Sequence, residues 1–233
     1  MKKQNLLSKA MNPKRNAMII SFILLFIFYS LSSVAQGKDN WVLKKNMNDI
    51  NVWTRIEPNS GLPEYKAATK IEAPISSLLE VLLDVEAYPN LFIGTKSAKL
   101  LKKESDTQIC YMHNECPFPF SDRDGIYSST IDRNPVNGMI RISIVALPDY
   151  KPKHSNRVRI PVSVGYWTLK PLHDGTVEVV YQQYADPGGS FPLWIIKLYS
   201  VNIPFKTLNN LRSQVQLPKY QNNFDSNFIT YTK

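Results

Sequence analysis

The sequence predicts an α+β fold in which a curved antiparallel sheet packs around a long C-terminal helix. Two observations lead to this prediction. Short alternating segments separated by turn residues fill the region from Ser97 to Tyr184, and a long helical pattern follows from Phe191 to about Val215. With 233 residues, of which 43% are hydrophobic, the chain has enough apolar material for a sizeable core, which excludes general disorder.

The central region is predicted to form strands joined by tight turns. Apolar and polar residues alternate within each segment, and turn formers such as Asp174-Gly175 separate the segments. Tight turns join antiparallel neighbours, so the sheet is expected to be antiparallel. The expected strands are Ser97–Lys103, Thr107–Glu115, Gly125–Asp132, Met139–Ala146, Arg157–Leu169 and Thr176–Tyr184.

The C-terminal segment carries apolar residues at steps of three and four, which is the spacing of one helical face. These residues are Trp194, Leu198, Val201, Phe205, Leu208, Leu211 and Val215. Pro204 is expected to kink or split the helix, because proline lacks a backbone N–H and crowds the preceding turn. An apolar face this wide must be buried, and a sheet that covers it would curve around it.

The region before the central strands is predicted to contain both helices and strands. We expect a short helix over Trp41–Asn48, strands over Ile50–Arg55 and Glu64–Glu72, and a helix that begins at Ala73-Pro74 and ends at Tyr88-Pro89. Proline suits the first turn of a helix, and the residue before a proline disfavours helical conformation.

The first 35 residues have the pattern of an export signal. A basic start precedes the uncharged apolar run Ala17–Leu31, and small residues occupy the positions before a cleavage site at Ala35. We predict that the protein is exported, periplasmic or secreted, after cleavage near Ala35. The alternative is a retained N-terminal membrane anchor, although the run is shorter than the roughly 20 residues that span a bilayer. The remaining predicted segments are a tail at 36–40, one domain at 41–217 and a second tail at 218–233.

Composition excludes several classes of protein. Without the five basic residues of the first 35 positions, 23 Lys and Arg face 19 acidic residues, so no concentrated basic stripe indicates nucleic-acid binding. Three scattered His and two Cys leave little scope for a metal centre. Cys110 and Cys116 lie about 20 Å apart in an extended strand, so two free buried thiols are favoured over a disulfide, which would require a bend.

Four segments occur in an order that resembles the START (StAR-related lipid-transfer) domain family. They are Asp84–Tyr88, Pro117–Asp124, Val158–Trp167 and Asp186–Pro192, and the resemblance covers about residues 41 to 215. It implies a helix-grip fold in an exported, bacterial-type member, with a tunnel between the sheet and the C-terminal helix. It also implies a lipid or sterol-like ligand held without catalysis, with no cofactor, no metal and possible transient contact with a membrane surface.

Candidate ligand contacts follow from this expected tunnel. On the helix they are Trp194, Leu198, Val201 and Phe205; on the strands they are Tyr111, His113, Glu115, Tyr127 and Trp167. For each residue, ordinary core packing is the competing interpretation. The resemblance implies an architectural role for Arg123-Asp124, with Arg123 as the alternative contact for a ligand head group. Arg141, Arg157 and Arg159 alternate with apolar neighbours and are expected on a solvated outer face.

No nucleophilic triad or phosphate-binding loop is recognisable, so no catalytic residue is predicted. The sequence therefore favours a non-enzymatic protein that binds, and possibly transfers, a hydrophobic small molecule. Two alternatives stay open: a cyclase or hydrolase of the same fold, with Glu115 or His113 as acid or base, and a filled-core interaction module at a membrane surface.

Overall fold

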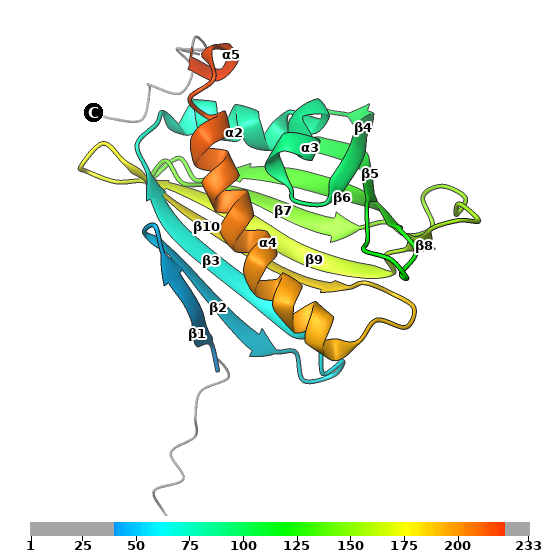
Figure 1. Ribbon diagram of the computed structural model, residues 1–233. Helices are drawn as coiled ribbons and strands as arrows, with labels where there is room; N and C mark the ends of the chain where they lie inside the picture. The colour runs from blue at the N-terminus through cyan, green and yellow to red at the C-terminus, as the bar shows by residue number, and fades with distance from the viewer. Residues whose placement is uncertain (1–39, 222–233) are drawn as a thin grey trace, which may run out of the picture. The chain divides into compact units, whose positions relative to one another are not determined.

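A computed structural model describes residues 40–221 and shows a curved sheet wrapped around helix α4 (Leu193–Gln214) (Figure 1). The sheet order is β1-β2-β3-β10-β9-β7-β6-β5-β4 with antiparallel neighbours throughout, and a short strand β8 pairs in parallel with β6. The strands are β1 (Val42–Met47), β2 (Ile50–Ile56), β3 (Pro63–Ile71), β4 (Thr95–Lys103), β5 (Thr107–Asn114), β6 (Arg123–Arg133), β7 (Ile140–Ala146), β8 (Val158–Arg159), β9 (Val162–Pro171) and β10 (Val177–Asp186). The predicted α+β class and antiparallel sheet are confirmed.

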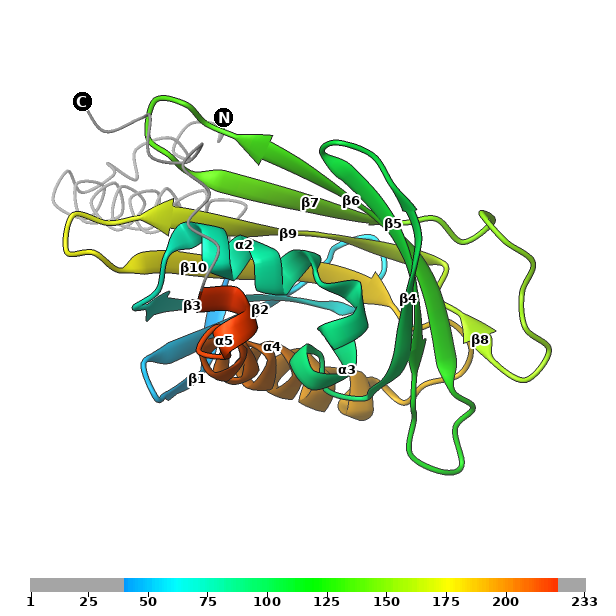
Figure 2. The same cartoon turned by 90° about the horizontal axis from the view of Figure 1, so that it is seen from above.

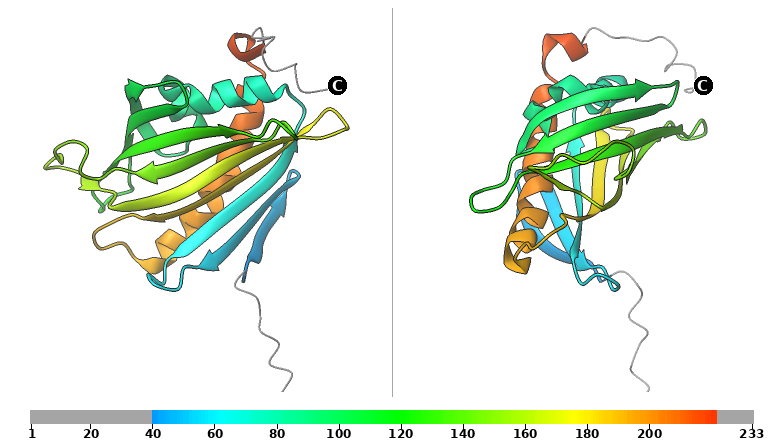
Figure 3. Two further views of the ribbon diagram at one scale, coloured as in Figure 1. Left: turned by 180° about the vertical axis from the view of Figure 1, so that it is seen from behind. Right: turned by 90° about the vertical axis from the view of Figure 1, so that its right-hand side faces the viewer.

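The helices lie on the concave face of the sheet. Besides α4, they are α2 (Ile75–Leu83), the 3-10 turn η1 (Val85–Ala87), α3 (Tyr88–Leu91) and α5 (Pro218–Gln221). Seen from above, β4 and β5 bend round toward α3 (Figure 2), and Figure 1 shows α4 running in front of β3. Figure 3 shows the opposite, convex face of the sheet from behind. Helix α4 packs against β2 and β3, and α2 packs against β9.

The hydrophobic core lies between the sheet, α2 and the C-terminal half of α4. Leu78 of α2, Leu208 and Leu211 of α4, and Ile50 and Leu169 of the sheet are completely buried there. Each such side chain stabilises the fold by about 1.5–3 kcal/mol relative to exposure. The core therefore fixes one end of α4 against the sheet.

The predicted helix over Trp41–Asn48 is wrong, because this segment forms β1. Met47 pairs with Ile50 across a two-residue turn, and Asn48 and Asp49 have φ angles of 54° and 56°. Two positive φ angles are typical of the hairpin turns that match strand twist, and asparagine and aspartate tolerate them well. Pairing with β2 thus outweighs the local helical pattern.

Two predicted boundaries also differ from the structure. The helix that follows Pro74 ends at Leu83, and Tyr88-Pro89 opens α3 instead of ending the longer helix, with the proline in the first turn where no N–H is needed. The predicted strand Arg157–Leu169 is divided into β8 and β9. The break falls at Ile160-Pro161, where proline cannot donate to the sheet.

Helix α4 runs through Pro204 without a break, so the predicted split does not occur. Both cysteines are free, as expected; Cys110 is buried, whereas Cys116 is only partly buried. Within residues 40–221, no helix has the length and apolar character needed to cross a membrane. The predicted export signal and most of both tails lie outside the described residues, although residues 218–221 of the second tail form α5.

Candidate functional site

A cavity of about 370 Å³ lies between α4 and the concave face of the sheet. Its volume falls within the range of small-molecule sites, about 300–1,000 Å³. Strands β3 to β7, β9 and β10, the α3–β4 connection and the first half of α4 all contribute to the wall. Lining side chains include Tyr65, Tyr88, Phe92, Cys110, Met112, Tyr127, Ile142, Ile144, Trp167, Tyr181, Phe191, Ile196, Tyr199 and Ile203.

Aromatic rings from neighbouring strands form one side of this cavity. Trp167 and Tyr181 face each other across β9 and β10 and stack with their centroids 3.9 Å apart. The Tyr127 ring lies back over its own strand, where a Cβ at Gly125 would come within 2.3 Å of the Tyr127 hydroxyl oxygen. Glycine at position 125 is therefore required for this ring position.

A small polar group interrupts the aromatic wall. The Tyr65 hydroxyl lies 2.9 Å from the Tyr181 hydroxyl and 2.8 Å from Oε1 of Gln183, whose Nε2 donates to Ser163 Oγ at 2.7 Å. Tyr65, Tyr181 and Gln183 line the cavity. Their oxygen atoms can hold a polar group of a ligand within otherwise apolar surroundings.

Burial keeps the titratable groups of this wall neutral. Loss of solvent raises the pKa of the Tyr65, Tyr127 and Tyr181 hydroxyls above their ordinary value. It also raises the pKa of the Cys110 thiol to about 12. These side chains therefore carry no charge at neutral pH, and Cys110 is an unreactive thiol.

Two lining residues within the described part of the chain are charged: Arg123 at the start of β6, and Glu115 just after β5. The Arg123 guanidinium donates to the backbone oxygens of Ser121 at 2.6 Å, Pro187 at 3.2 Å and Gly188 at 3.0 Å. It also lies 4.4 Å from the centre of the Phe191 ring. Arg123 thus ties the wall of the cavity to the loop that leads into α4.

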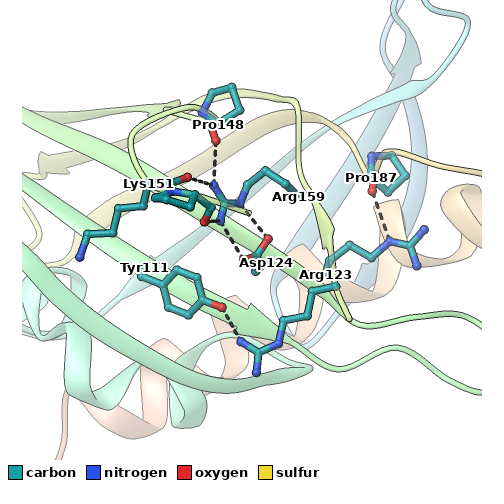
Figure 4. Close-up of polar contacts among 9 residues, drawn as sticks. Tyr111, Arg123, Asp124, Pro148, Lys151, Arg159 and Pro187 are labelled. Atoms are coloured by element: carbon teal, nitrogen blue, oxygen red, sulfur yellow. Dashed lines mark hydrogen bonds and ion pairs between the residues drawn. The ribbon is translucent and has the colours of Figure 1, made fainter. Parts of the chain in front are cut away.

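Asp124 points away from Arg123 and belongs to a different cluster (Figure 4). Its carboxylate accepts bonds of 2.8 and 3.0 Å from Arg159, which also donates to the carbonyls of Pro148 and Lys151. Burial tends to raise the pKa of Asp124, but the bonds from Arg159 outweigh this and lower it. The expected solvated position of Arg159 is wrong, because β8 brings it onto this buried carboxylate.

The structure separates the candidate strand residues into two groups. Tyr127, Trp167, Glu115 and Arg123 line the cavity. Tyr111 and His113 occupy the alternate positions of β5 and face away from it; the Tyr111 hydroxyl accepts from Arg157, and His113 Nε2 lies 2.7 Å from Asp122 Oδ2. Strand alternation explains the difference, since Cys110, Met112 and Asn114 occupy the inward positions.

The four candidate helix residues lie outside the cavity lining. Trp194 and Leu198 are 68% and 52% exposed, Phe205 is buried in the core, and Val201 packs against its edge. The helix instead turns Ile196, Tyr199, Ser200 and Ile203 toward the cavity. The apolar face of this helix is wider than one stripe, so periodicity alone does not show which part of it faces the cavity.

Sequence reasoning also missed Tyr65, Tyr181 and Gln183. The alternation of Tyr65 with Ala67, Thr69 and Ile71 was the available signal for the inner face of β3, but nothing local indicated that β10 would lie beside β3. That pairing joins segments more than a hundred residues apart.

The cavity can hold an apolar molecule with few polar contacts, because each CH₂ group moved out of water contributes about 0.8 kcal/mol. The fold and this site define a small-molecule carrier domain, in which a sheet and a helix enclose a hydrophobic ligand. The START domain family model matches residues 29–220, and the chain belongs to this family. The predicted family membership and the helix-grip fold are confirmed.

The chain is similar to three further proteins, two of which are named as lipid transfer proteins. The crystal structure of a STAR-related lipid transfer protein fragment from Xanthomonas axonopodis is 36% identical, covers 77% of this chain and all of that chain, and superposes with a TM-score of 0.72. An uncharacterized protein of Pseudomonas aeruginosa is 30% identical over 76% of this chain and 88% of its own. Phosphatidylcholine transfer protein of Mus musculus is 27% identical over 70% of this chain and 78% of its own.

Proposed function

We propose that this protein binds a lipid in the cavity between α4 and the sheet and carries it without chemical change. The observation that carries this proposal is the cavity of about 370 Å³ with its largely apolar and aromatic lining. The similarity to a phosphatidylcholine transfer protein favours a phospholipid over a sterol-like ligand. An empty space of this size also argues against a filled-core interaction module.

The enzyme alternative is less well supported. Catalysis of this kind requires an acid or base within hydrogen-bond reach of the substrate. His113 faces away from the cavity and is engaged by Asp122, so it cannot act together with Glu115. Glu115 is solvent-exposed, and its backbone N–H donates to Gly94 O at 2.7 Å.

We further propose that the ligand enters through a membrane-facing surface beside the cavity. Trp194 and Leu198 are exposed on the outer side of α4, and Phe118 is 97% exposed in the β5–β6 loop. Phe120 of that loop stacks on Phe191 at 4.5 Å, which connects it to the start of α4. Exposed aromatic and aliphatic groups at this position suit contact with lipid. The first half of α4 would then open; hydrogen exchange as slow there as in the central strands would contradict this.

We propose export of the protein, with cleavage near Ala35, on the basis of its N-terminal pattern. A retained anchor is the alternative. N-terminal sequencing of the protein from its native host tests this: a first residue of Gln36 is expected, and Met1 or Met11 would contradict export with cleavage.

Native mass spectrometry after gentle extraction tests the binding function directly. We expect the protein to carry one lipid and to take up added phospholipid from vesicles. The variant Ile144→Trp, which places a large ring in the cavity wall, should lose this uptake, whereas Val145→Trp on the exposed side of the same strand should retain it. A wild-type protein that takes up no lipid would contradict the proposal.

A further inference from the structure

We propose that Arg123 forms an anion subsite in the cavity and that the bound lipid carries an oxyanion head group, either a phosphate or a carboxylate. This inference rests on the proposed lipid-binding function and assigns the chemistry of its ligand. A neutral ligand, such as a sterol or a diacylglycerol, would leave the subsite unused.

The first argument comes from a comparison of two buried arginines. Arg159 has a full counter-charge, because both oxygens of Asp124 accept from its guanidinium. Arg123 is only 5% exposed, yet its bonds go to the backbone carbonyls of Ser121, Pro187 and Gly188. Among the ion pairs found in residues 40–221, none includes Arg123. Carbonyl dipoles solvate a cation but leave its net charge, and a buried net charge is costly without a partner.

The second argument is position. Arg123 lines the cavity beside Cys116, Pro187 and Phe191. A guanidinium has five N–H donors; three bond to the carbonyls and another reaches the Cys116 thiol, which leaves a donor for an oxyanion. Charge-assisted bonds from a guanidinium fork to phosphate or carboxylate oxygens are about twice as strong as neutral hydrogen bonds. The buried cation therefore favours an anionic group at this end of the cavity.

The third argument is pre-organisation. The loop that holds Arg123 contains Gly188 and Gly189, both with positive φ. A Cβ at Gly188 would lie 3.1 Å from Pro161 and Val158, so the loop packs closely against β8 and the residues that follow it. Stacking on Phe191 further restricts the guanidinium. A side chain held this way loses little entropy when it binds an anion.

Displacement of a neutral fluorescent alkyl probe tests the subsite with two matched ligand pairs. One pair is a phosphatidylglycerol and a diacylglycerol with the same acyl chains; the other is a fatty acid and a fatty alcohol of equal length. The wild-type protein should bind the oxyanion member of at least one pair about tenfold more tightly than its neutral counterpart. Preference in the first pair alone identifies a phosphate head group, and preference in the second alone identifies a carboxylate.

Arg123→Gln also removes bonds to the loop before α4, so it should weaken binding of every ligand to some extent, but it should weaken the oxyanion members about tenfold more than the neutral members; Arg123→Lys should retain part of the preference. Arg141→Gln serves as the control. The Arg141 guanidinium lies over the ring of Tyr166 on β9 and does not line the cavity, so the variant removes an equal charge and should keep the preference. An equal loss of affinity for both members in Arg123→Gln would assign Arg123 to loop anchoring and overturn the subsite. Equal affinity of the wild type for both members of each pair would overturn it without any variant. Binding of neither member would overturn the lipid-binding function itself.

Discussion

The two halves of α4 have different environments although they belong to one helix. In the second half, Phe205, Leu208 and Leu211 are buried, and Arg212 donates to Asn48 O and Thr69 Oγ1. In the first half, one side lines the cavity and the other exposes Trp194. Pro204 separates the halves.

This difference indicates that α4 is anchored at one end and more weakly held at the other. The second half gains both core packing and polar bonds, whereas the first half, apart from the buried Ile195, faces the cavity on one side and solvent on the other. Regions with few buried apolar contacts open at lower free energy than the core does. A cavity that must admit a ligand requires such a region.

The largest effect is expected from Leu211→Ala in the anchored half. Removal of a completely buried leucine side chain should lower the free energy of unfolding by about 2–5 kcal/mol. Urea denaturation measures this. Ile196→Ala, at a cavity-lining position of the first half, is the matched control and should cost clearly less; equal losses would remove the distinction between the halves.

Pro204→Ala, at the boundary between the two halves, should raise the stability of α4, whereas Leu211→Ala lowers the stability of the fold. The alanine supplies a backbone N–H to the preceding turn, which should stabilise the helix by about 1–3 kcal/mol. Hydrogen exchange should slow over residues 193–203 and change little over residues 205–214. Slower exchange in the second half alone would contradict a weakly held first half.

A smaller, pH-dependent effect on stability is expected at Asp84, which follows α2 and accepts hydrogen bonds from Lys219 and Tyr220 of α5. Burial acts to raise the pKa of Asp84, but hydrogen bonds from Lys219 and Tyr220 outweigh it, so the folded-state pKa lies below the unfolded one. The stabilisation is therefore complete above the unfolded pKa of about 3.9 and is lost as pH falls through the lowered folded value.

Asp84→Asn should consequently cost under about 1 kcal/mol at pH 7 and progressively less as pH falls toward 2. Thermal unfolding across this pH range measures the difference. A penalty that persists at pH 2 would show that the carboxylate charge is not its source.

The smallest effect on stability is expected from the double variant Trp194→Ala/Leu198→Ala. Both side chains are largely exposed, so the free energy of unfolding should change by no more than about 0.5 kcal/mol. The rate of lipid transfer between vesicles should nevertheless fall, because these groups form the proposed membrane-facing surface. Val162→Ala, an exposed apolar position on β9, serves as the control; equal transfer rates in both variants would contradict that surface.

Strong local signals predicted most of the fold. Alternation and the Asp174-Gly175 turn located β9 and β10, and the register Val177↔Pro171 confirms their hairpin. The long apolar helix was equally clear. The sequence predictions are wrong where the local signal is weak: the pattern of residues 41–48 favours a helix although the segment pairs as β1, and alternation puts Arg159 in solvent although β8 brings it onto Asp124.

The candidate site was predicted less completely than the fold. Tyr127, Trp167, Glu115 and Arg123 line the cavity, whereas Tyr111 and His113 face away from it, because alternation along a strand does not show which of its two faces is the inner one. The helix residues that face the cavity could not be predicted, because α4 is apolar around much of its circumference. Packing against the sheet determines which side of the helix faces inward. Tyr65 and Gln183 lie together in the cavity wall only because β3 pairs with β10, which local sequence does not predict.

The amino-acid sequence alone determined the α+β class, the antiparallel strands, the amphipathic C-terminal helix and the family, since each follows from local periodicity, turn chemistry or short motifs. Tertiary structure alone decided which helix residues face the cavity. It also decided that Arg159 forms an ion pair with Asp124, whereas Arg123 bonds to backbone carbonyls. These outcomes depend on contacts between segments far apart in the chain, where the geometry of packing selects among side chains that local patterns cannot distinguish.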